Sequence, residues 1–473
     1  MSTTFPSLFS PLRVGPMECK NRIFSTGHMT WLLDGGVPSD DMVAYHQARA
    51  AGGASLIITE ACAVHPSTGP MHIHGFSDDC IAGYRRIADA VKPHDCKVFG
   101  QLSHGGGHNY STLDGTRPVA YAPSALPREW SHNMPRAMTH EDIDEVVACY
   151  GATASRMSQA GLDGIEIMAS HNLLPAQFLN ARTNHRTDQY GGSLKNRMRF
   201  LREVIANVWA SVADGVVVGM RISGDEKQND GLQPEDVLDI CMALDEDGTL
   251  DYFNVAAGSM SGLSGLIHVV PPMNYEGGYV APLAAVIKAR VSKPVLVAGR
   301  INQPQIAEQI VASGQADMCG MTRAQIADPE MANKARDGRI NDIRACIGCN
   351  QACIGHMING FGISCIQRPE TGRELRYGAR VPAEQPRTVF VARGGPAGMK
   401  AACVAAERGH QVVLFERSGV LGGQVQLAQL LPGRSEFGGL ITNFTREMEL
   451  AGVDVRRNTE LDRAMIENEA PDA

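Results

Sequence analysis

Short runs of β-branched and apolar residues alternate with longer amphipathic stretches over the first two thirds of the chain, from Asn21 to about Arg336. This alternation is typical of βα units around a parallel sheet. It predicts eight strands, at Arg22–Thr26, Ser55–Glu60, Lys97–Ser103, Gly164–Ser170, Val216–Ser223, Tyr252–Ala257, Pro294–Gly299 and Asp317–Thr322. Eight parallel strands with intervening helices close most simply into an α/β (β/α)8 TIM barrel, and an open doubly wound sheet is the alternative.

Polar side chains stand at or just after the ends of most of these predicted strands. They are His28, Glu60, Gln101, His104, His171, Arg221, Arg300 and Arg323. In a barrel, such positions form the C-terminal mouth, where active sites are built. The predicted barrel therefore also predicts a functional site.

A second unit follows the barrel. The polar, proline-rich stretch 369–387 (PETGRELRYGARVPAEQPR) predicts a linker. A strand at Thr388–Ala392, a glycine-rich turn, a helix at Pro396–Arg408 and a strand at Gln411–Phe415 then form the βαβ opening of a Rossmann-type unit. We expect three parts: a barrel (1–340), a cysteine loop with linker (341–386) and a partial Rossmann-like nucleotide-binding domain (387–473).

Composition and charge narrow the function classes. The 473 residues are 44% hydrophobic and 20% charged, which excludes a disordered or fibrous chain. A net charge of -8 argues against a nucleic-acid partner. The N-terminus lacks the basic and apolar regions of a signal peptide, and nowhere do eighteen apolar residues run together. We expect a soluble, cytoplasmic protein with no membrane partner.

Four cysteines stand close together in ACIGCNQACIGHMINGFGISC. Cys346, Cys349, Cys353 and Cys365 are spaced C-x2-C-x3-C-x11-C. Thiols so closely set, in a chain that we expect to stay reduced, indicate a metal centre. Zinc ribbons more often use two CxxC pairs, so we favour a [4Fe–4S] cluster and keep structural zinc as the alternative.

The segment FLNARTNHRTDQYGGSLKNRMRF, Phe178 to Phe200, resembles the signature of the Old Yellow Enzyme class of FMN barrels. With the cysteine run downstream, the whole chain is similar to the multidomain NADH:flavin oxidoreductase branch that contains 2,4-dienoyl-CoA reductase and trimethylamine dehydrogenase. The resemblance implies an FMN barrel, a [4Fe–4S] cluster and a C-terminal nucleotide-binding region. Because relatives commonly associate, it also implies a homo-oligomer.

The resemblance assigns FMN contacts residue by residue. Gln101 would hydrogen-bond the flavin ring, and Arg221 would lie against the N1/C2 carbonyl edge, where a cation stabilises the anionic reduced flavin. The residues implied for the FMN phosphate are Gly299, Arg300, Gly320 and Arg323. The residues implied to approach the ring through their backbones are Ser25, Thr26, Gly27 and Ala61.

The substrate loop departs from the family pattern. Ene-reducing members carry a histidine or asparagine pair and then a tyrosine proton donor, but Met168, His171 and Leu173 stand in those places here. Only His171 could hydrogen-bond an anion or carbonyl, while His268, after the sixth strand, could serve as an alternative acid or base. Met29 occupies the region where methylamine-oxidising relatives attach the flavin to a cysteine, so we expect non-covalent FMN.

The C-terminal unit also departs from its pattern. A dinucleotide fingerprint needs G-x-G-x-x-G, yet VARGGPAGM puts Arg393 at the first glycine, leaving Gly395 and Gly398. That arginine would need a turn conformation that glycine adopts most easily. Glu416 is well placed for the ribose of FAD. The chain ends where relatives continue, so we expect a fragment with neither a complete FAD site nor an NAD(P)H site.

Two classes of function follow. The first is a flavin oxidoreductase that moves hydride between flavin N5 and a small organic substrate, with electrons passing through the cluster and an external electron carrier. Enone or dienoyl reduction and oxidative N-demethylation of a methylated amine both stay open. The missing tyrosine weakens the former, and the missing cysteine weakens the latter only slightly. The second is a catalytically impaired, metal-stabilised binding or scaffold barrel, which Arg393 and the altered substrate loop support.

Overall fold

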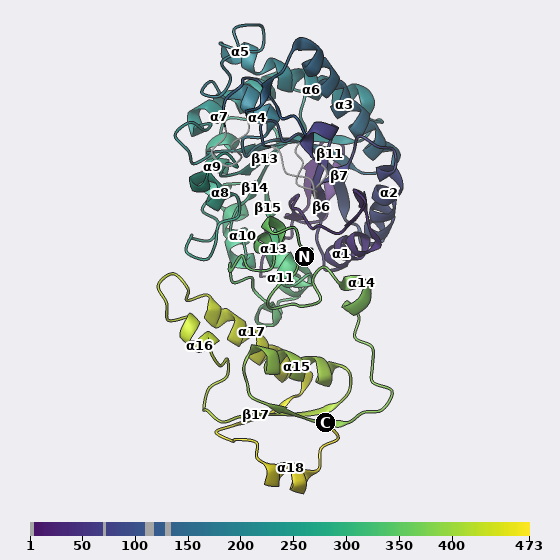
Figure 1. Ribbon diagram of the computed structural model, residues 1–473, viewed down its shortest axis with the longest axis vertical. Helices are drawn as coiled ribbons and strands as arrows, with labels where there is room; N and C mark the ends of the chain where they lie inside the picture. The colour runs from purple at the N-terminus through teal and green to yellow at the C-terminus, as the bar shows by residue number, and fades with distance from the viewer. Residues whose placement is uncertain (1–3, 70–71, 109–117, 128–133) are drawn as a thin grey trace.

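A closed barrel of parallel strands forms the larger part of the molecule (Figure 1). The computed structural model describes residues 4–69, 72–108, 118–127 and 134–473. The barrel strands are β3 (Ile23–Ser25), β6 (Leu56–Ala63), β8 (Lys97–Ser103), β11 (Gly164–Ala169), β12 (Val217–Ser223), β13 (Tyr252–Ala256), β14 (Val295–Ala298) and β15 (Met318–Gly320). Because β3 pairs with both β15 and β6, the sheet closes on itself. The predicted barrel is confirmed, and the open-sheet alternative is wrong.

Helices surround these strands on the outside. The longer ones are α1 (Asp40–Ala51), α2 (Cys80–Val91), α3 (His140–Gln159), α6 (Arg199–Ser211), α7 (Pro234–Asp247), α9 (Ala281–Lys288) and α10 (Pro304–Ala312). The shorter ones are α4 (Leu174–Leu179), α5 (Leu194–Arg197), α8 (Leu263–Val269), α11 (Thr322–Ala327) and α12 (Met331–Arg336). Local sequence sets their starts: Thr139 and Asp142 form a capping box at α3, and Pro234 occupies the first turn of α7.

The N-terminal end of the barrel is filled by side chains. Phe24, Phe99 and Tyr252 belong to an inner apolar cluster that the hairpin β1 (Leu12–Val14)–β2 (Met17–Cys19) covers with Val14 and Cys19. Gly219 makes room for this packing, since a Cβ there would stand 2.0 Å from Cε1 of Tyr252. Because this end is packed solid, space for a ligand is left at the opposite, C-terminal end.

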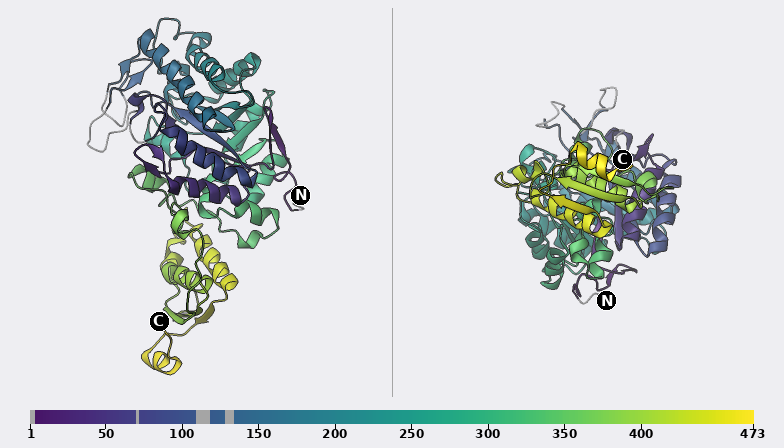
Figure 2. Two further views of the ribbon diagram at one scale, coloured as in Figure 1. Left: turned by 90° about the vertical axis from the view of Figure 1, so that its right-hand side faces the viewer. Right: turned by 90° about the horizontal axis from the view of Figure 1, so that it is seen from below.

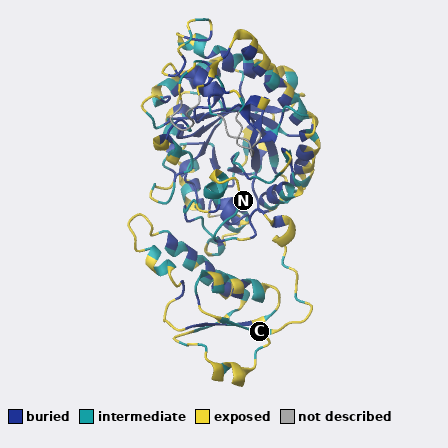
Figure 3. Ribbon diagram, viewed as in Figure 1, coloured by how far each residue is buried: buried dark blue, intermediate teal, exposed yellow. Residues whose placement is uncertain are grey.

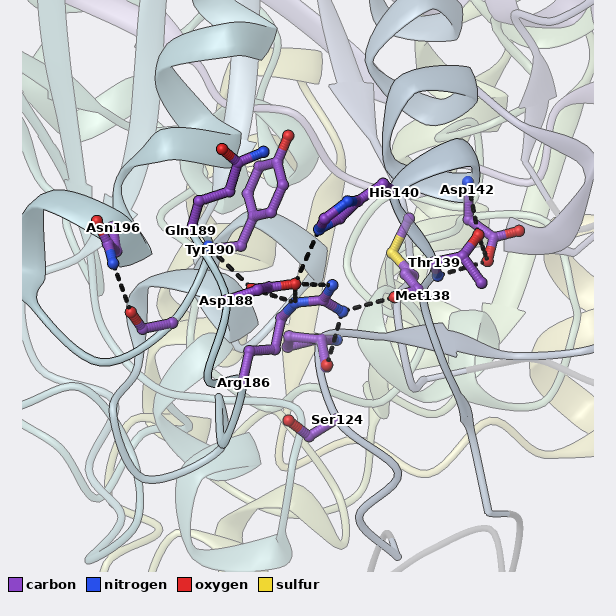
Figure 4. Close-up of polar contacts among 12 residues, drawn as sticks. Ser124, Met138, Thr139, His140, Asp142, Arg186, Asp188, Gln189, Tyr190 and Asn196 are labelled. Carbon is purple, nitrogen blue, oxygen red and sulfur yellow. Dashed lines mark hydrogen bonds and ion pairs between the residues drawn. The ribbon is translucent and has the colours of Figure 1, made fainter.

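The signature segment braces the loops between α4 and α6 (Figure 4). Arg186 donates to Asp188 through Nε and Nη2, and its Nη1 donates to the Met138 carbonyl at 2.6 Å. His140, at the start of α3, contacts the same Asp188 carboxylate at 3.0 Å. Asn184 donates to the carbonyls of Phe178 and Tyr190. These residues fasten α4, and with it the substrate loop that precedes α4, against α3.

The remaining chain forms a small three-layered extension at one end of the barrel (Figure 2). Its parallel sheet has the order β16 (Thr388–Ala392), β17 (Gln411–Glu416), β18 (Asp454–Arg457), and α15 (Pro396–Glu407) packs against α17 (Phe437–Ala451) on it. Shorter helices are α13 (Ile354–Ile358), α14 (Glu374–Tyr377), α16 (Val425–Ala428) and α18 (Arg463–Glu469). Figure 3 shows the barrel strands buried and α18 exposed. The predicted βαβ opening is confirmed.

Side chains from three parts of the chain meet between the barrel and this extension. Ile347, beside the clustered cysteines, belongs to the apolar core that Leu440 of α17 and Met399 of α15 form. Arg344 pairs with Glu447 of α17. The start of the cysteine loop is therefore packed against the extension. Throughout the part of the chain that is described, no helix combines the length and apolar character needed to cross a membrane.

Candidate functional site

A cavity of about 710 Å³ opens at the C-terminal ends of the barrel strands. Its volume lies within the range of cofactor and small-molecule sites. Ten of the residues that the sequence analysis assigned to the flavin or to catalysis line it: Thr26, Gly27, Ala61, Gln101, His171, Arg221, Gly299, Arg300, Gly320 and Arg323. Ser25 ends β3 and is buried beside them. Residues scattered over 298 positions of sequence are thus brought to one cavity.

Two apolar walls of this cavity were not predicted from the sequence. One comes from α8 and the following turn, with Leu263, Leu266 and Val269. The other comes from the cysteine loop, with Met357 and Ile363. Neither segment carries a periodic or motif signal that points inward, because loops and short helices are positioned by tertiary packing rather than by local pattern.

A buried carboxylate organises the polar floor of the cavity. Glu166, in the middle of β11, accepts from Gln101 Nε2 at 2.6 Å and from Asn254 Nδ2 at 2.7 Å. Burial raises the pKa of Glu166, and the nearby Arg221 guanidinium acts against that rise. Gln101, which lines the cavity, is held in place by this bond to Glu166. A charged residue inside an otherwise apolar strand was the sequence signal for Glu166 that the analysis missed.

Arg221 supplies a buried cation at this floor. It is 6% exposed, its Nη1 lies 3.5 Å from the Gly27 carbonyl, and its Nε has no hydrogen-bond partner among the described residues. Burial lowers the pKa of its guanidinium and Glu166 acts the other way, but an arginine keeps its proton in proteins. A buried, partly unpaired guanidinium suits a group that becomes anionic, such as a reduced flavin ring.

Backbone and guanidinium groups gather at the ends of β14 and β15. Gly320 leaves no room for a side chain, since a Cβ there would be 2.7 Å from Thr26 Cγ2. Arg323 donates to Asn350 Oδ1 at 2.8 Å, and Arg300 pairs with Glu436 at the start of α17. Small residues beside two arginines fit a phosphate group. The partners of both arginines come from the cysteine loop and the extension, which the sequence could not indicate.

His171 stands in a strained backbone position at the end of β11. His171 and Asn172 both have left-handed φ angles, 57° and 58°, which few residue types adopt readily. Gln177 of α4 steadies them by donating to the Asn172 carbonyl at 2.7 Å. His171 Nδ1 lies 3.1 Å from the Gly258 carbonyl. Burial, with a smaller contribution from Arg221, lowers the pKa of His171 to about 3, so its ring is neutral.

His268, the second predicted acid or base, lies differently. It belongs to α8, but its ring packs against Tyr275 and Tyr279 and is not among the residues that line the cavity. Its Nδ1 is 3.3 Å from the Tyr279 hydroxyl. Burial lowers the pKa of His268, and Lys227 adds to that effect. On α8, Leu266 and Val269 therefore line the cavity, while His268 faces the two tyrosines.

His28 and Glu60, two other polar residues from the strand ends, hold the loop that follows β3 in place. His28 is bonded at both ring nitrogens, to the Thr26 carbonyl and the Tyr45 hydroxyl, each at 2.7 Å. Burial raises the pKa of Glu60 to about 7, against the effect of its bonds from Thr30. The loop presents Trp31 to the cavity with a left-handed φ of 58°.

The four clustered cysteines are half-buried, and Cys353 also lines the cavity. Burial, with smaller contributions from the other three thiols, raises the pKa of Cys349 to about 12, so Cys349 lies within electrostatic reach of the other three. No group of three or more histidine, cysteine or acidic side chains in the described residues is arranged to hold a metal ion. The predicted metal centre therefore stays a prediction.

The Rossmann turn has the strain that its sequence predicts. Arg393 adopts a φ of 94°, a region that favours glycine. Glu416 already accepts from the Gly394 N–H at 2.8 Å and from Ser418 through both N–H and hydroxyl at 2.9 Å. Gly395 precedes α15 with open space at its Cβ position, whereas a Cβ on Gly398 would meet the Arg393 carbonyl at 2.2 Å. The predicted ribose carboxylate is thus engaged within the protein.

Comparison with known proteins agrees with this architecture. The family described as "NADH:flavin oxidoreductase / NADH oxidase family" matches residues 7–342, and "FAD dependent oxidoreductase" matches residues 388–462. An N,N-dimethylglycine/sarcosine dehydrogenase of Chromohalobacter salexigens is 37% identical over 99% of this chain and 68% of its own. An NADH oxidase of Thermoanaerobacter brockii is 37% identical over 99% of this chain and 72% of its own.

A solved structure of 2-naphthoyl-CoA reductase superimposes with a TM-score of 0.92 at 29% identity, covering 99% of this chain and 73% of that one. The family match spans more than two thirds of the chain, and it coincides with the barrel whose mouth gathers the predicted flavin contacts. The chain therefore belongs to the NADH:flavin oxidoreductase / NADH oxidase family, in its multidomain branch, and is a flavin-dependent oxidoreductase.

Proposed function

We propose that this enzyme binds FMN without a covalent bond, binds a [4Fe–4S] cluster, and oxidatively demethylates a small N-methylamine. One C–H hydrogen of the methyl group leaves with two electrons as hydride. The resulting iminium takes up water and breaks into formaldehyde and the demethylated amine. The similarity to a dimethylglycine/sarcosine dehydrogenase supports this substrate class.

The observation that carries the direction of the reaction is which acidic side chains line the cavity, as far as the structure describes it. Reduction of a conjugated alkene needs a proton donor at one carbon while hydride reaches the other. Among the described residues that line the cavity there is no tyrosine, aspartate, glutamate or lysine. Leu173 and Met168 present apolar side chains. Four histidines also line the cavity: His28, His72, His108 and His171. Burial lowers the pKa of His28 and of His72 to about 4 and that of His171 to about 3, so these three rings are neutral and donate protons poorly. Oxidation of an amine requires no such donor.

The residues present fit the flavin. Gln101 and Arg221 would contact the ring, and Gly320 and Arg323 would hold the phosphate, with Ala61 in the same cavity wall. Bound FMN supplies a two-electron acceptor next to the substrate. Met29 lines the cavity where a cysteine would be needed for covalent attachment.

Cys346, Cys349, Cys353 and Cys365 would hold the cluster. Their spacing and mutual proximity support this assignment over structural zinc. Because Cys353 lines the same cavity as the flavin contacts, a cluster held by this cysteine would be next to that cavity and would supply an exit for electrons to an external carrier.

The experiment is anaerobic absorbance of the protein reconstituted with FMN and iron–sulfur cluster. On adding sarcosine or another N-methylamine, we expect the flavin absorbance at about 450 nm to bleach, as it does when flavins generally are reduced. We also expect formaldehyde in an amount equal to the flavin reduced. Glycine, the demethylated counterpart, is the matched control and should give neither signal. Bleaching by NADH with reoxidation by an enone, and none by amines, would instead make the enzyme a reductase.

A further inference from the structure

Asn350 stands in the cysteine loop between Cys349 and Cys353 and has no role in the site described so far. Its backbone has a left-handed φ of 57°, a conformation that asparagine tolerates better than most residue types. Its carbonyl accepts the Gly355 N–H at 3.0 Å, which holds the turn of the loop. The half-buried side chain of Asn350 contacts two other segments, both of which reach the cavity.

These two contacts fix the direction of the Asn350 amide. Oδ1 lies 2.8 Å from Nη1 of Arg323, and a guanidinium can only donate. Nδ2 lies 2.7 Å from the Val270 carbonyl, which can only accept. Asn350 therefore uses both ends of its amide at once. A carboxylate could not donate to Val270, and an apolar side chain could do neither.

Arg323 is the cation at which the two predicted cofactor sites meet. It is half-buried near the end of β15, and it lines the cavity together with Cys353. Among its nitrogens only Nη1 donates to a described residue, so the rest of the guanidinium is left for a phosphate. Burial raises the pKa of Cys353 to about 11, the Cys346 thiol adds to that rise, and the Arg323 guanidinium acts against it. The charge of Arg323 therefore reaches this cysteine.

We propose that Asn350 is a positioning residue that holds the Arg323 guanidinium between the FMN phosphate and Cys353, so that one cation serves both cofactors. This inference rests on the proposed function and adds a residue to it. Without Asn350, a phosphate dianion would draw the guanidinium toward itself along a flexible side chain. The bond from Asn350 to Val270 anchors the amide to the barrel, and the amide in turn keeps Arg323 beside the cysteine loop.

Flavin binding gives the first test, without turnover. Asn350→Gly removes the side chain, and glycine adopts the left-handed backbone freely. The protein freed of flavin is titrated with FMN and with riboflavin, which has the same ring but no phosphate, and quenching of flavin fluorescence is followed. We expect the FMN affinity of Asn350→Gly to fall by about tenfold while the riboflavin affinity stays the same. Asn359→Ala, exposed in the same loop, is the matched control and should change neither affinity.

The reduction potential of the cluster gives the second test. It is measured by a redox titration followed by electron paramagnetic resonance, on protein loaded with FMN and cluster. A reduced cluster carries one more negative charge than an oxidised one, so a nearby cation raises its potential. We expect Asn350→Gly to shift the potential downward, Arg323→Met to shift it further in the same direction, and Asn359→Ala to leave it unchanged.

A double variant shows whether Asn350 acts through Arg323. Arg323→Met/Asn350→Gly should bind FMN no more weakly than Arg323→Met alone, because the amide has no guanidinium left to hold. Additive losses would overturn the proposal. So would an unchanged ratio of FMN to riboflavin affinity, or an unchanged cluster potential, in Asn350→Gly; the proposed function would then still stand. If the unsubstituted protein binds no iron on reconstitution, the cluster of the proposed function fails, and the shared role of Arg323 fails with it.

Discussion

A buried ion pair ties the first barrel helix to the segment after the cysteine loop, and removing its anion should be costly. Arg49 of α1 and Glu374 of α14 are 2.6 Å apart, with side chains 1% and 3% exposed. The Arg49 guanidinium also lies over the Tyr45 ring, 3.4 Å from its centroid. Tyr45 packs in turn against Ile363, with Cys353 alongside. The perturbation is Glu374→Ala.

The expected magnitude follows from these contacts. Without Glu374, the Arg49 charge stays buried with only the Tyr45 carbonyl at 2.7 Å as a partner, and two of its nitrogens already have none among the described residues. Breaking a buried pair by removing one partner costs about 3–5 kcal/mol. The Gly372 N–H also loses its acceptor at 2.8 Å. We expect the barrel to melt roughly 6–10 °C lower.

The assay is thermal unfolding of Glu374→Ala, Glu374→Gln and the double variant Arg49→Met/Glu374→Leu. The glutamine variant keeps an acceptor for Gly372 and should be less destabilised. The double variant should recover part of the loss because the Arg49 charge is gone, while Arg368, 3.4 Å from Glu374, still loses its partner. Iron content should fall before flavin content, since Tyr45 supports the cysteine loop. A loss below about 1 kcal/mol, or a double variant as unstable as Glu374→Ala, would refute the argument.

Four further predictions follow from single side chains. Arg221→Met should lower the flavin reduction potential by an amount on the order of tens of millivolts, because the anionic reduced ring loses its cation; an unchanged potential in a dye-coupled titration would remove Arg221 from the flavin. Cys349→Ala should lose iron in a metal assay while FMN stays bound, and full iron retention would show that the ligand set is wrong. Arg393→Gly should raise stability by about 1 kcal/mol in urea unfolding, because glycine relieves the left-handed strain; a loss would mean that the arginine side chain has a role. The pKa of Glu60 is raised when folded, so its contribution to stability is full below the unfolded value and is lost as pH rises through about 7; Glu60→Gln should flatten that decline between pH 5 and pH 7.5, and an identical slope would exclude Glu60 as its source.

The sequence by itself determined the scaffold. Runs of buried β-branched residues recur with the period of βα units, and each of the eight predicted strands is present within a few residues. The same local logic located the βαβ unit and the strain at Arg393. These features depend on contacts between near neighbours in the chain, which is why a pattern of residue types suffices to predict them.

Only the tertiary structure decided what the site can do. His171 was visible in the sequence, but its backbone N–H is held by Ser223 and its ring by the Gly258 carbonyl, which lie 52 and 87 residues away. Glu166 gathers partners from two other strands, and His268 turns toward tyrosines instead of the cavity. The direction of a hydrogen bond depends on which groups meet in three dimensions, and a linear pattern of residue types does not contain that information.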